Sequence, residues 1–287
     1  MMVQALIWLA LLVASERVPV AADVELHVVE SGSGPALVFV PGWTMTTEFF
    51  EPQLEAFADS YRVLTFDPRS HGASTKTATG NTYEQHGRDL AVLLDRLELR
   101  DVVLVGWSSG CHDVLAYVRA RGVERLRGVV LIDEPPKAVG DASKEWVYGS
   151  FEGYRSTFES TLHARRDSAE GLARWMVERE LTSDEIDWIV EESLKTPDEA
   201  ALTLMVDTTL LDFVPEAKRL DGAVPVLYML REDWGQAPVR WLRENTPAAK
   251  VARLGSHAEH WEKPAVFNAK LEEFLETLPP WSAEAPE

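Results

Sequence analysis

The 287-residue sequence is poor in cysteine and in basic residues. Its one cysteine, Cys111, excludes an intramolecular disulfide and a zinc site built from several thiolates. Lysine and arginine number 28 against 47 aspartate and glutamate residues, so the formal net charge is −19 at pH 7. Because so acidic a chain is repelled by phosphate groups, we expect neither nucleic acid nor an anionic membrane surface as a partner. The 46% hydrophobic and 26% charged content excludes intrinsic disorder.

The sequence also lacks an apolar run long enough to span a membrane. The apolar run at residues 5–14 (ALIWLALLVA) falls short of the roughly 20 residues that a spanning helix needs. It is typical of a secretory signal peptide, and Val20 and Ala22 are small residues suited to cleavage before Asp23. However, residues 1–4 carry no lysine or arginine. We expect a signal peptide at residues 1–22 and export to the periplasm or beyond. The alternatives are a cytoplasmic protein whose N-terminal segment packs on the domain, and a misassigned start.

From residue 24 onward, short apolar runs alternate with amphipathic stretches. This alternation predicts an α/β fold, with a mostly parallel, doubly wound sheet covered by helices on both faces. We expect the core to comprise residues 23–136 and 216–287. Apolar runs typical of buried strands lie at residues 24–30, 36–40, 61–66, 102–105, 128–133, 224–230 and 250–254, and helical spacing at residues 48–60, 83–99, 109–121 and 264–278.

The alternation stops between the two parts of this core. Residues 137–215 contain helical patterns, no convincing strand pattern and many aromatic residues. We interpret this segment as a helical cap inserted after the strand at residues 128–133. Most of its aromatic side chains are expected to pack between helices, and a minority to face a pocket.

The sharpest chemical signal is the pentapeptide Gly106-Trp107-Ser108-Ser109-Gly110. It has the form G-x-S-x-G and lies between a predicted strand and a predicted helix, which is the context of a nucleophile elbow. In such a turn a strained serine, here Ser108, is exposed as the nucleophile. The backbone N–H of Ser109 opens the helix and should point toward a developing oxyanion. The alternative is a glycine-rich turn with a buried serine.

A second oxyanion donor is expected in the loop after the strand at residues 36–40, which reads Pro41-Gly42-Trp43. Gly42 would let the backbone approach closely, and the Trp43 N–H would be the donor. The alternative is a Pro-Gly turn followed by a core tryptophan.

In combination, five motifs resemble the α/β-hydrolase superfamily, and within it the cofactor-free haloperoxidase and esterase branch. The resemblance covers roughly residues 24–278, and it is more specific to the fold than to a substrate. One departure is Pro41, where many relatives have histidine. The motifs are PGW at 41–43, DPRSHGAS at 67–74, GWSSG at 106–110, LIDEPP at 131–136 and SHAEHWEKP at 256–264.

The resemblance implies that the catalytic base is a histidine after the last strand. Of the seven histidines, His257 occupies that place, and His260 on the same loop is its competitor. The orienting acid has two main candidates. Asp233 follows the strand at residues 224–230, where most of the superfamily carries its acid, and it is the expected one. Asp133 follows the preceding strand, as in a minority of relatives, and Glu134 beside it is a third possibility.

These roles predict a serine hydrolase that acts on a small-molecule substrate through an acyl-enzyme. The expected substrate is a small or medium ester, thioester or lactone with an apolar acyl part. Cofactor-free haloperoxidase or perhydrolase chemistry with the same triad is one alternative. Another is a ligand receptor that turns over slowly on a hydrolase scaffold. The sequence contains no metal-binding, phosphate-binding or dinucleotide-binding motif, so we expect no metal and no cofactor.

Overall fold

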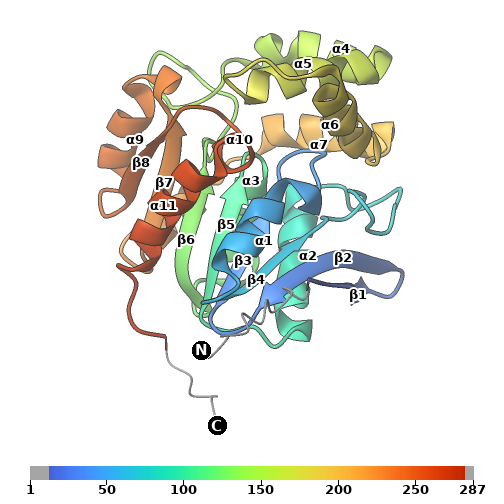
Figure 1. Cartoon of the computed structure of the whole chain (residues 1–287). Helices are drawn as coiled ribbons and strands as arrows, with labels where there is room; N and C mark the ends of the chain where they lie inside the picture. Colours follow the sequence, from blue (N-terminus) through green and yellow to red (C-terminus); the bar gives the residue numbers. More distant parts are fainter. Residues whose placement is uncertain (1–12, 282–287) are drawn as a thin grey trace, which may run out of the picture.

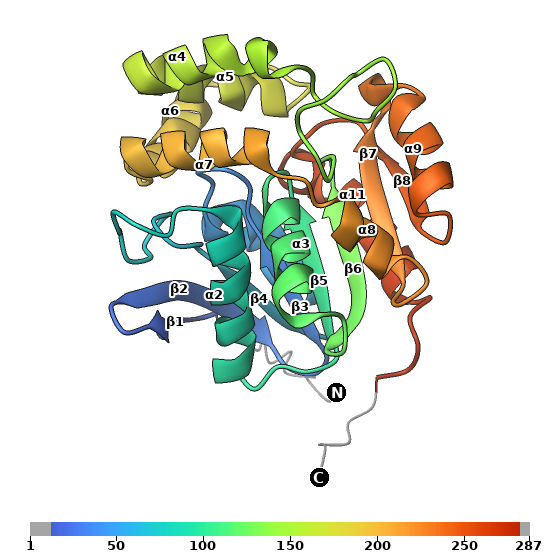
Figure 2. The same cartoon turned by 180° about the vertical axis from the view of Figure 1, so that it is seen from behind.

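An eight-stranded sheet runs through the centre of the protein, with helices on both faces (Figure 1, Figure 2). The computed structural model describes residues 13–281. The strand order is β1-β2-β4-β3-β5-β6-β7-β8; β2 pairs antiparallel with β1 and β4, and all other pairs are parallel. The expected α/β fold is therefore confirmed. The strands are β1 (Ala14–Ala21), β2 (Val24–Gly32), β3 (Ala36–Val40), β4 (Arg62–Phe66), β5 (Val102–Trp107), β6 (Leu126–Ile132), β7 (Val226–Arg231) and β8 (Lys250–Leu254).

Two helical layers enclose the central strands. Helices α1 (Glu51–Phe57) and α11 (Pro264–Leu275) cover one face, and α2 (Tyr83–Arg96), α3 (Gly110–Arg121) and α8 (Val214–Leu220) cover the other (Figure 1, Figure 2). Every residue of β3 and β5 is buried, because both faces of these strands are covered. Three short helices lie at η1 (Thr47–Phe50), η3 (Glu232–Trp234) and α10 (Glu259–Glu262), and α9 (Ala237–Asn245) lies between β7 and β8 in sequence.

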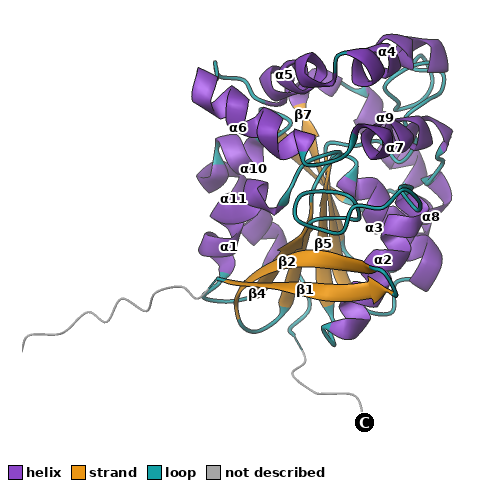
Figure 3. Ribbon diagram, turned by 90° about the vertical axis from the view of Figure 1, so that its right-hand side faces the viewer, coloured by secondary structure: helices purple, strands orange, loops and turns teal. Residues whose placement is uncertain are grey.

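Four helices lie above the carboxyl ends of the parallel strands (Figure 1, Figure 3). They are α4 (Arg155–His163), α5 (Arg165–Met176), α6 (Ser183–Leu194) and α7 (Asp198–Leu210), and η2 (Phe151–Tyr154) precedes them. We call these four helices the cap. Because active sites of open α/β sheets form at the carboxyl ends of strands, the cap covers the edge where a site is expected. None of the helices within residues 13–281 is both long and apolar enough to cross a membrane.

The first strand lies within the range expected for a signal peptide. Strand β1 pairs antiparallel with β2 and packs on α2, with Val18 and Val20 buried. Cleavage after Ala22 would cut the turn between β1 and β2 and remove this edge strand from the sheet. Residues 14–21 are therefore part of the fold, as in the alternative of an N-terminal segment that packs on the domain. The remainder of the expected signal peptide, residues 1–12, lies outside the described residues, and export stays a prediction.

Truncation tests whether β1 belongs to the folded domain. We expect a chain beginning at Asp23 to unfold with a free energy lower by roughly 3 kcal/mol than a chain beginning at Val13, because two buried valines and one edge of strand pairing are lost. Urea unfolding followed by circular dichroism measures the difference. Equal stability of the two forms would show that β1 is dispensable.

Candidate active site

Ser108 lies in a sharp turn between β5 and α3. Its φ of 54° is in the left-handed region, which a serine rarely adopts. The glycines on either side permit the turn. A Cβ on Gly106 would lie 2.7 Å from the Gly110 carbonyl oxygen, and one on Gly110 would lie 2.3 Å from the Val40 carbonyl oxygen. The turn is thus built as a nucleophile elbow, and it places Ser108 in the wall of a pocket.

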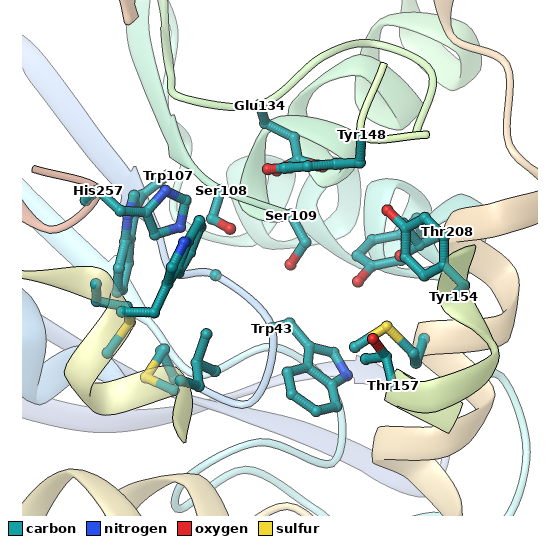
Figure 4. Close-up of a pocket in the computed structure, with 17 residues that line it drawn as sticks. Trp43, Trp107, Ser108, Ser109, Glu134, Tyr148, Tyr154, Thr157, Thr208 and His257 are labelled. Carbon is teal, nitrogen blue, oxygen red and sulfur yellow. The ribbon is translucent and has the colours of Figure 1, made fainter. Parts of the chain in front are cut away.

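This pocket lies between the sheet and the cap and has a volume of about 300 Å³ (Figure 4). Ser108 and His257 line it together, and Figure 4 shows the imidazole ring beside the serine. Much of the remaining wall is apolar or aromatic and comes from the cap and the segment that leads into it. These side chains include Tyr148, Tyr154, Leu172, Trp175, Met176 and Met205.

Hydrogen bonds to both the main chain and the ring hold His257 in place. Its carbonyl oxygen accepts a 2.8 Å hydrogen bond from Trp107 Nε1, and its Nδ1 lies 2.6 Å from Asp133 Oδ2. Since an ionised carboxylate only accepts, Nδ1 carries the hydrogen. This fixes the tautomer in which Nε2 has a free lone pair for the Ser108 hydroxyl.

Asp133 is fully buried at the end of β6, with a left-handed φ of 57°. Besides His257, its carboxylate accepts hydrogen bonds from the Arg231 backbone N–H (3.1 Å), Arg231 Nε (2.5 Å) and Trp234 Nε1 (2.7 Å). Burial alone would raise the pKa of Asp133. The hydrogen bond from His257, with the charge and hydrogen bond of Arg231, nevertheless holds that pKa below its ordinary value. The carboxylate is therefore ionised at neutral pH although it is buried.

The expectation that Asp233 lies beside His257 is wrong. Asp233 sits in η3, its side chain is 68% exposed, and it accepts a hydrogen bond from Arg231 Nη1 at 3.1 Å. The chain leaves β7 through Arg231, whose guanidinium turns inward to Asp133 while Asp233 turns outward to solvent. The second candidate, Asp133, occupies the place next to the ring.

The competing histidine, His260, has a ring that lies away from solvent and has no hydrogen-bond partner among the described residues. It is fully buried, its ring stacks on Phe50 with centroids 4.8 Å apart, and neither ring nitrogen has a hydrogen-bond partner in residues 13–281. Burial lowers the pKa of His260 to about 3, so the ring is neutral and acts as packing. Among the described residues, no group of three or more His, Cys, Asp or Glu side chains could hold a metal ion.

The two expected oxyanion donors flank the nucleophile. Ser109 is the N-cap of α3, and the Gly42 backbone lies so close that a Cβ there would be 3.0 Å from Ser108 Cβ. Ser109 and Trp43 both line the pocket, and neither backbone N–H is taken up by a backbone acceptor in the described part of the chain.

The loop that carries Trp43 is fastened to the cap. Trp43 Nε1 donates to the Ala201 carbonyl at 2.9 Å, and the hydroxyl oxygens of Thr44 and Ser193 are 2.8 Å apart. Arg165 of α5 places its guanidinium carbon 5.0 Å from the centre of the Trp43 ring. The Trp43 indole lines the pocket, and the loop that carries it contacts three helices of the cap, α5, α6 and α7.

Sequence reasoning missed two residues that complete the site, Arg231 and Trp234. Both donate to Asp133, and Arg231 also lies over the Trp175 ring at 4.5 Å. One signal was available for Arg231, because it is a charged residue at the end of a strand that is otherwise apolar and buried. Trp234 carried no signal that separated it from a surface tryptophan.

Comparison with known proteins agrees with this fold. Residues 35–171 match the family described as alpha/beta hydrolase fold. A non-heme chloroperoxidase from Kitasatospora aureofaciens is 36% identical over 122 residues, which are 42% of this chain and 44% of that protein. The chain thus matches less than half the length of this relative. A crystal structure of bromoperoxidase from Bacillus anthracis superposes with a TM-score of 0.84 at 22% identity, covering 92% of this chain and 100% of that one.

The chain has the α/β-hydrolase fold. Among proteins with this fold, it resembles the non-heme haloperoxidases and esterases. A pimeloyl-[acyl-carrier protein] methyl ester esterase from Nitrosomonas europaea is 24% identical over 82% of this chain and 92% of that protein. An esterase from Exiguobacterium antarcticum superposes with a TM-score of 0.80 at 20% identity, covering 88% of this chain and 96% of that one.

The contrast between the two carboxylates can be tested by stability. We expect Asp133→Asn to lower the free energy of unfolding by about 2–4 kcal/mol, because it removes the buried carboxylate that pairs with Arg231 and leaves it only the exposed carboxylate of Asp233 among the described pairs. Asp233→Asn should change it by less than about 1 kcal/mol, since that pair is exposed on the Asp233 side. Urea unfolding at pH 7 measures both.

The same measurement has a defined pH dependence. Because folding lowers the pKa of Asp133, its ionisation stabilises the native state above the unfolded-state pKa of about 4 and ceases to do so as the pH falls through the folded-state pKa. The stability gap between the wild type and Asp133→Asn should therefore narrow below about pH 4. A gap that widens in acid contradicts the assignment.

Proposed function

We propose that this α/β-hydrolase is a serine hydrolase whose triad is Ser108, His257 and Asp133. The observation that carries the proposal is the buried Asp133–His257 hydrogen bond of 2.6 Å, with the imidazole ring beside the elbow serine in the wall of a largely apolar pocket (Figure 4). The acid differs from the one first expected, and the nucleophile and the base are those that the sequence indicates. Nucleophile, base, orienting acid and two free backbone donors are the parts that acyl transfer needs.

In the acylation step, Ser108 Oγ attacks the acyl carbon while His257 Nε2 takes the hydroxyl proton. The ionised Asp133 holds the Nδ1–H tautomer and stabilises the imidazolium that forms. The backbone N–H groups of Trp43 and Ser109 donate to the oxyanion of the tetrahedral intermediate. His257 then gives its proton to the leaving oxygen or sulfur, and the acyl-enzyme remains.

In the second step, water attacks the acyl-enzyme. His257 takes a proton from the water, the tetrahedral intermediate collapses, and Ser108 leaves with that proton. The pocket volume of about 300 Å³ suits a small or medium acyl group, and apolar side chains such as Leu172, Met176 and Met205 favour an apolar one. We therefore propose an ester, thioester or lactone as the substrate class.

A second candidate is perhydrolysis, which the similarity to a non-heme chloroperoxidase favours. Hydrogen peroxide would replace water as the attacking group, its oxygen would bond to the acyl carbon, and Ser108 would leave with the proton held by His257. The product would be a peracid, which can oxidise halide outside the site. The same residues serve both reactions, so the partition between acid and peracid at a fixed peroxide concentration decides between them.

Replacement of the nucleophile tests the class of reaction. We expect Ser108→Ala to lose at least about 10³-fold in kcat on p-nitrophenyl esters, because the triad acts as a unit. It should also lose covalent labelling by a fluorophosphonate, with an unchanged melting temperature to show that the protein is folded. Full esterase activity in this variant excludes Ser108 as the nucleophile. If the wild type releases one equivalent of product and then does not turn over, the alternative of a ligand receptor on a hydrolase scaffold is favoured.

Replacement of the acid tests the triad. We expect Asp133→Asn to lose up to about 10⁴-fold in kcat, as an analogous substitution in a serine protease does, because the amide favours the wrong imidazole tautomer. Asp233→Asn, the matched control, should keep its kcat within a few-fold. Both are compared on folded protein, and the reverse ranking would return the role to Asp233.

A further inference from the structure

The pocket contains a buried acid that the proposed reaction does not use. Glu134 follows Asp133 directly in sequence, but the two side chains point to different surroundings. Asp133 is hydrogen-bonded to His257, whereas Glu134 lines the substrate pocket. Figure 4 shows Glu134 and Tyr148 next to each other on the side of the pocket across from Trp43 in that view, with Ser108 and Ser109 nearby. A carboxyl group here interrupts a wall that is otherwise largely apolar and aromatic.

Glu134 has a single strong partner. Tyr148 Oη donates to Glu134 Oε2 at 2.6 Å. His112 Nε2 lies 3.5 Å from Glu134 Oε1, but it donates instead to the Pro135 carbonyl at 3.1 Å. Burial lowers the pKa of His112 to about 4, so this ring brings no positive charge. Among the described residues, no donor therefore lies within hydrogen-bond geometry of Oε1, although only 4% of Glu134 is exposed.

The surroundings of Glu134 favour its neutral form. Arg231, whose positive charge acts to lower the pKa of Glu134, is itself paired with Asp133 and Asp233. Burial raises the pKa of Glu134 to about 8; the Tyr148 hydrogen bond opposes this shift, and the negative charge of Asp133 adds to it. At neutral pH the carboxyl group is therefore protonated and is a hydrogen-bond donor.

We propose, on the basis of the serine hydrolase function above, that Glu134 is a specificity-determining residue that donates a hydrogen bond to a second oxygen of the substrate, with Tyr148 holding its carboxyl group in place. The preferred substrate then has an apolar body with one carbonyl or ether oxygen besides the scissile ester. A substrate without that oxygen leaves the buried carboxyl group unpaired, which reduces its transition-state binding. A cationic substrate fits less well, because it would require this carboxyl group to ionise first.

Matched ester pairs test the preference. The first pair is p-nitrophenyl hexanoate and its 4-oxo derivative, and the second is pentyl butanoate and 3-oxapentyl butanoate, so that an acyl-side and an alcohol-side oxygen are both probed. We expect the wild type to favour the oxygenated member of one pair by about tenfold in kcat/KM. Glu134→Gln, whose amide still donates, should keep most of this preference, and Glu134→Leu should lose it.

The pH dependence separates a donor from a merely structural residue. Above about pH 8 the wild-type preference should fall as Glu134 ionises, whereas that of Glu134→Gln should stay flat. Because the ratio compares two substrates of the same enzyme, pH effects that act equally on both substrates cancel. Tyr148→Phe removes the bond that favours the ionised form, so its preference should persist to higher pH.

The other groups near Glu134 do not titrate in this window. Burial lowers the pKa of His112 to about 4 and raises the pKa values of Cys111, Tyr148 and Tyr154, while Asp133 stays ionised. Arg231 carries its charge throughout.

A control and a labelling assay make each outcome decisive. Glu145→Gln, in the same segment but paired with Lys137 outside the pocket, should keep the wild-type ratio and its pH profile. Fluorophosphonate labelling of Ser108 confirms that each variant is folded and reactive. Three results would overturn this inference while leaving the proposed function intact. They are hydrolysis with no preference in either pair, a substrate ratio in Glu134→Leu equal to that of the wild type, and a preference for an aminoacyl ester. Absence of both labelling and hydrolysis in the wild type overturns the proposed function, and this inference with it.

Discussion

The site depends on one buried negative charge. The Asp133 carboxylate has no solvent exposure, and four hydrogen bonds replace the water that it lost on folding. Its donors come from the end of β7, from η3 and from the loop after β8, so a single side chain directly after β6 joins segments that lie about 100 residues or more further along the chain. Because the cost of burying a charge is offset only when all of its partners are in place, the imidazole orientation and the packing of these segments are coupled.

The parts of the site that the sequence predicted are those whose geometry is local. A strand, two glycines and a helix within a few residues are enough to form the turn at Ser108, and His257 follows the last strand directly. The acid could not be chosen in the same way. Asp133 and Asp233 both follow parallel strands at the same edge of the sheet, and the choice depends on Arg231, whose guanidinium reaches one carboxylate inside and the other at the surface. The direction in which the Arg231 side chain points is set by tertiary packing and not by the local sequence.

The fold was predictable for similar reasons, and the elements that the sequence analysis missed have physical causes. Fully buried strands such as β3 read as unbroken apolar runs, and β3 has the expected bounds. Strand β1 was missed because its alternation of Val18 and Val20 with exposed residues directly follows an apolar run that indicated a signal peptide. Helix α9 was missed because it buries only Pro238 and Leu242, which leaves too few apolar positions to establish a helical period.

The left-handed backbone at Asp133 limits which residue types can occupy this position. At a φ of 57°, most side chains crowd their own carbonyl oxygen, and aspartate, asparagine and glycine are the residues that adopt such a conformation with least strain. Of these three, only aspartate carries a charge. The backbone therefore excludes glutamate as a low-strain substitute, although glutamate has the same charge. Among the three residues that fit this backbone, aspartate alone can place an ionised carboxylate beside His257.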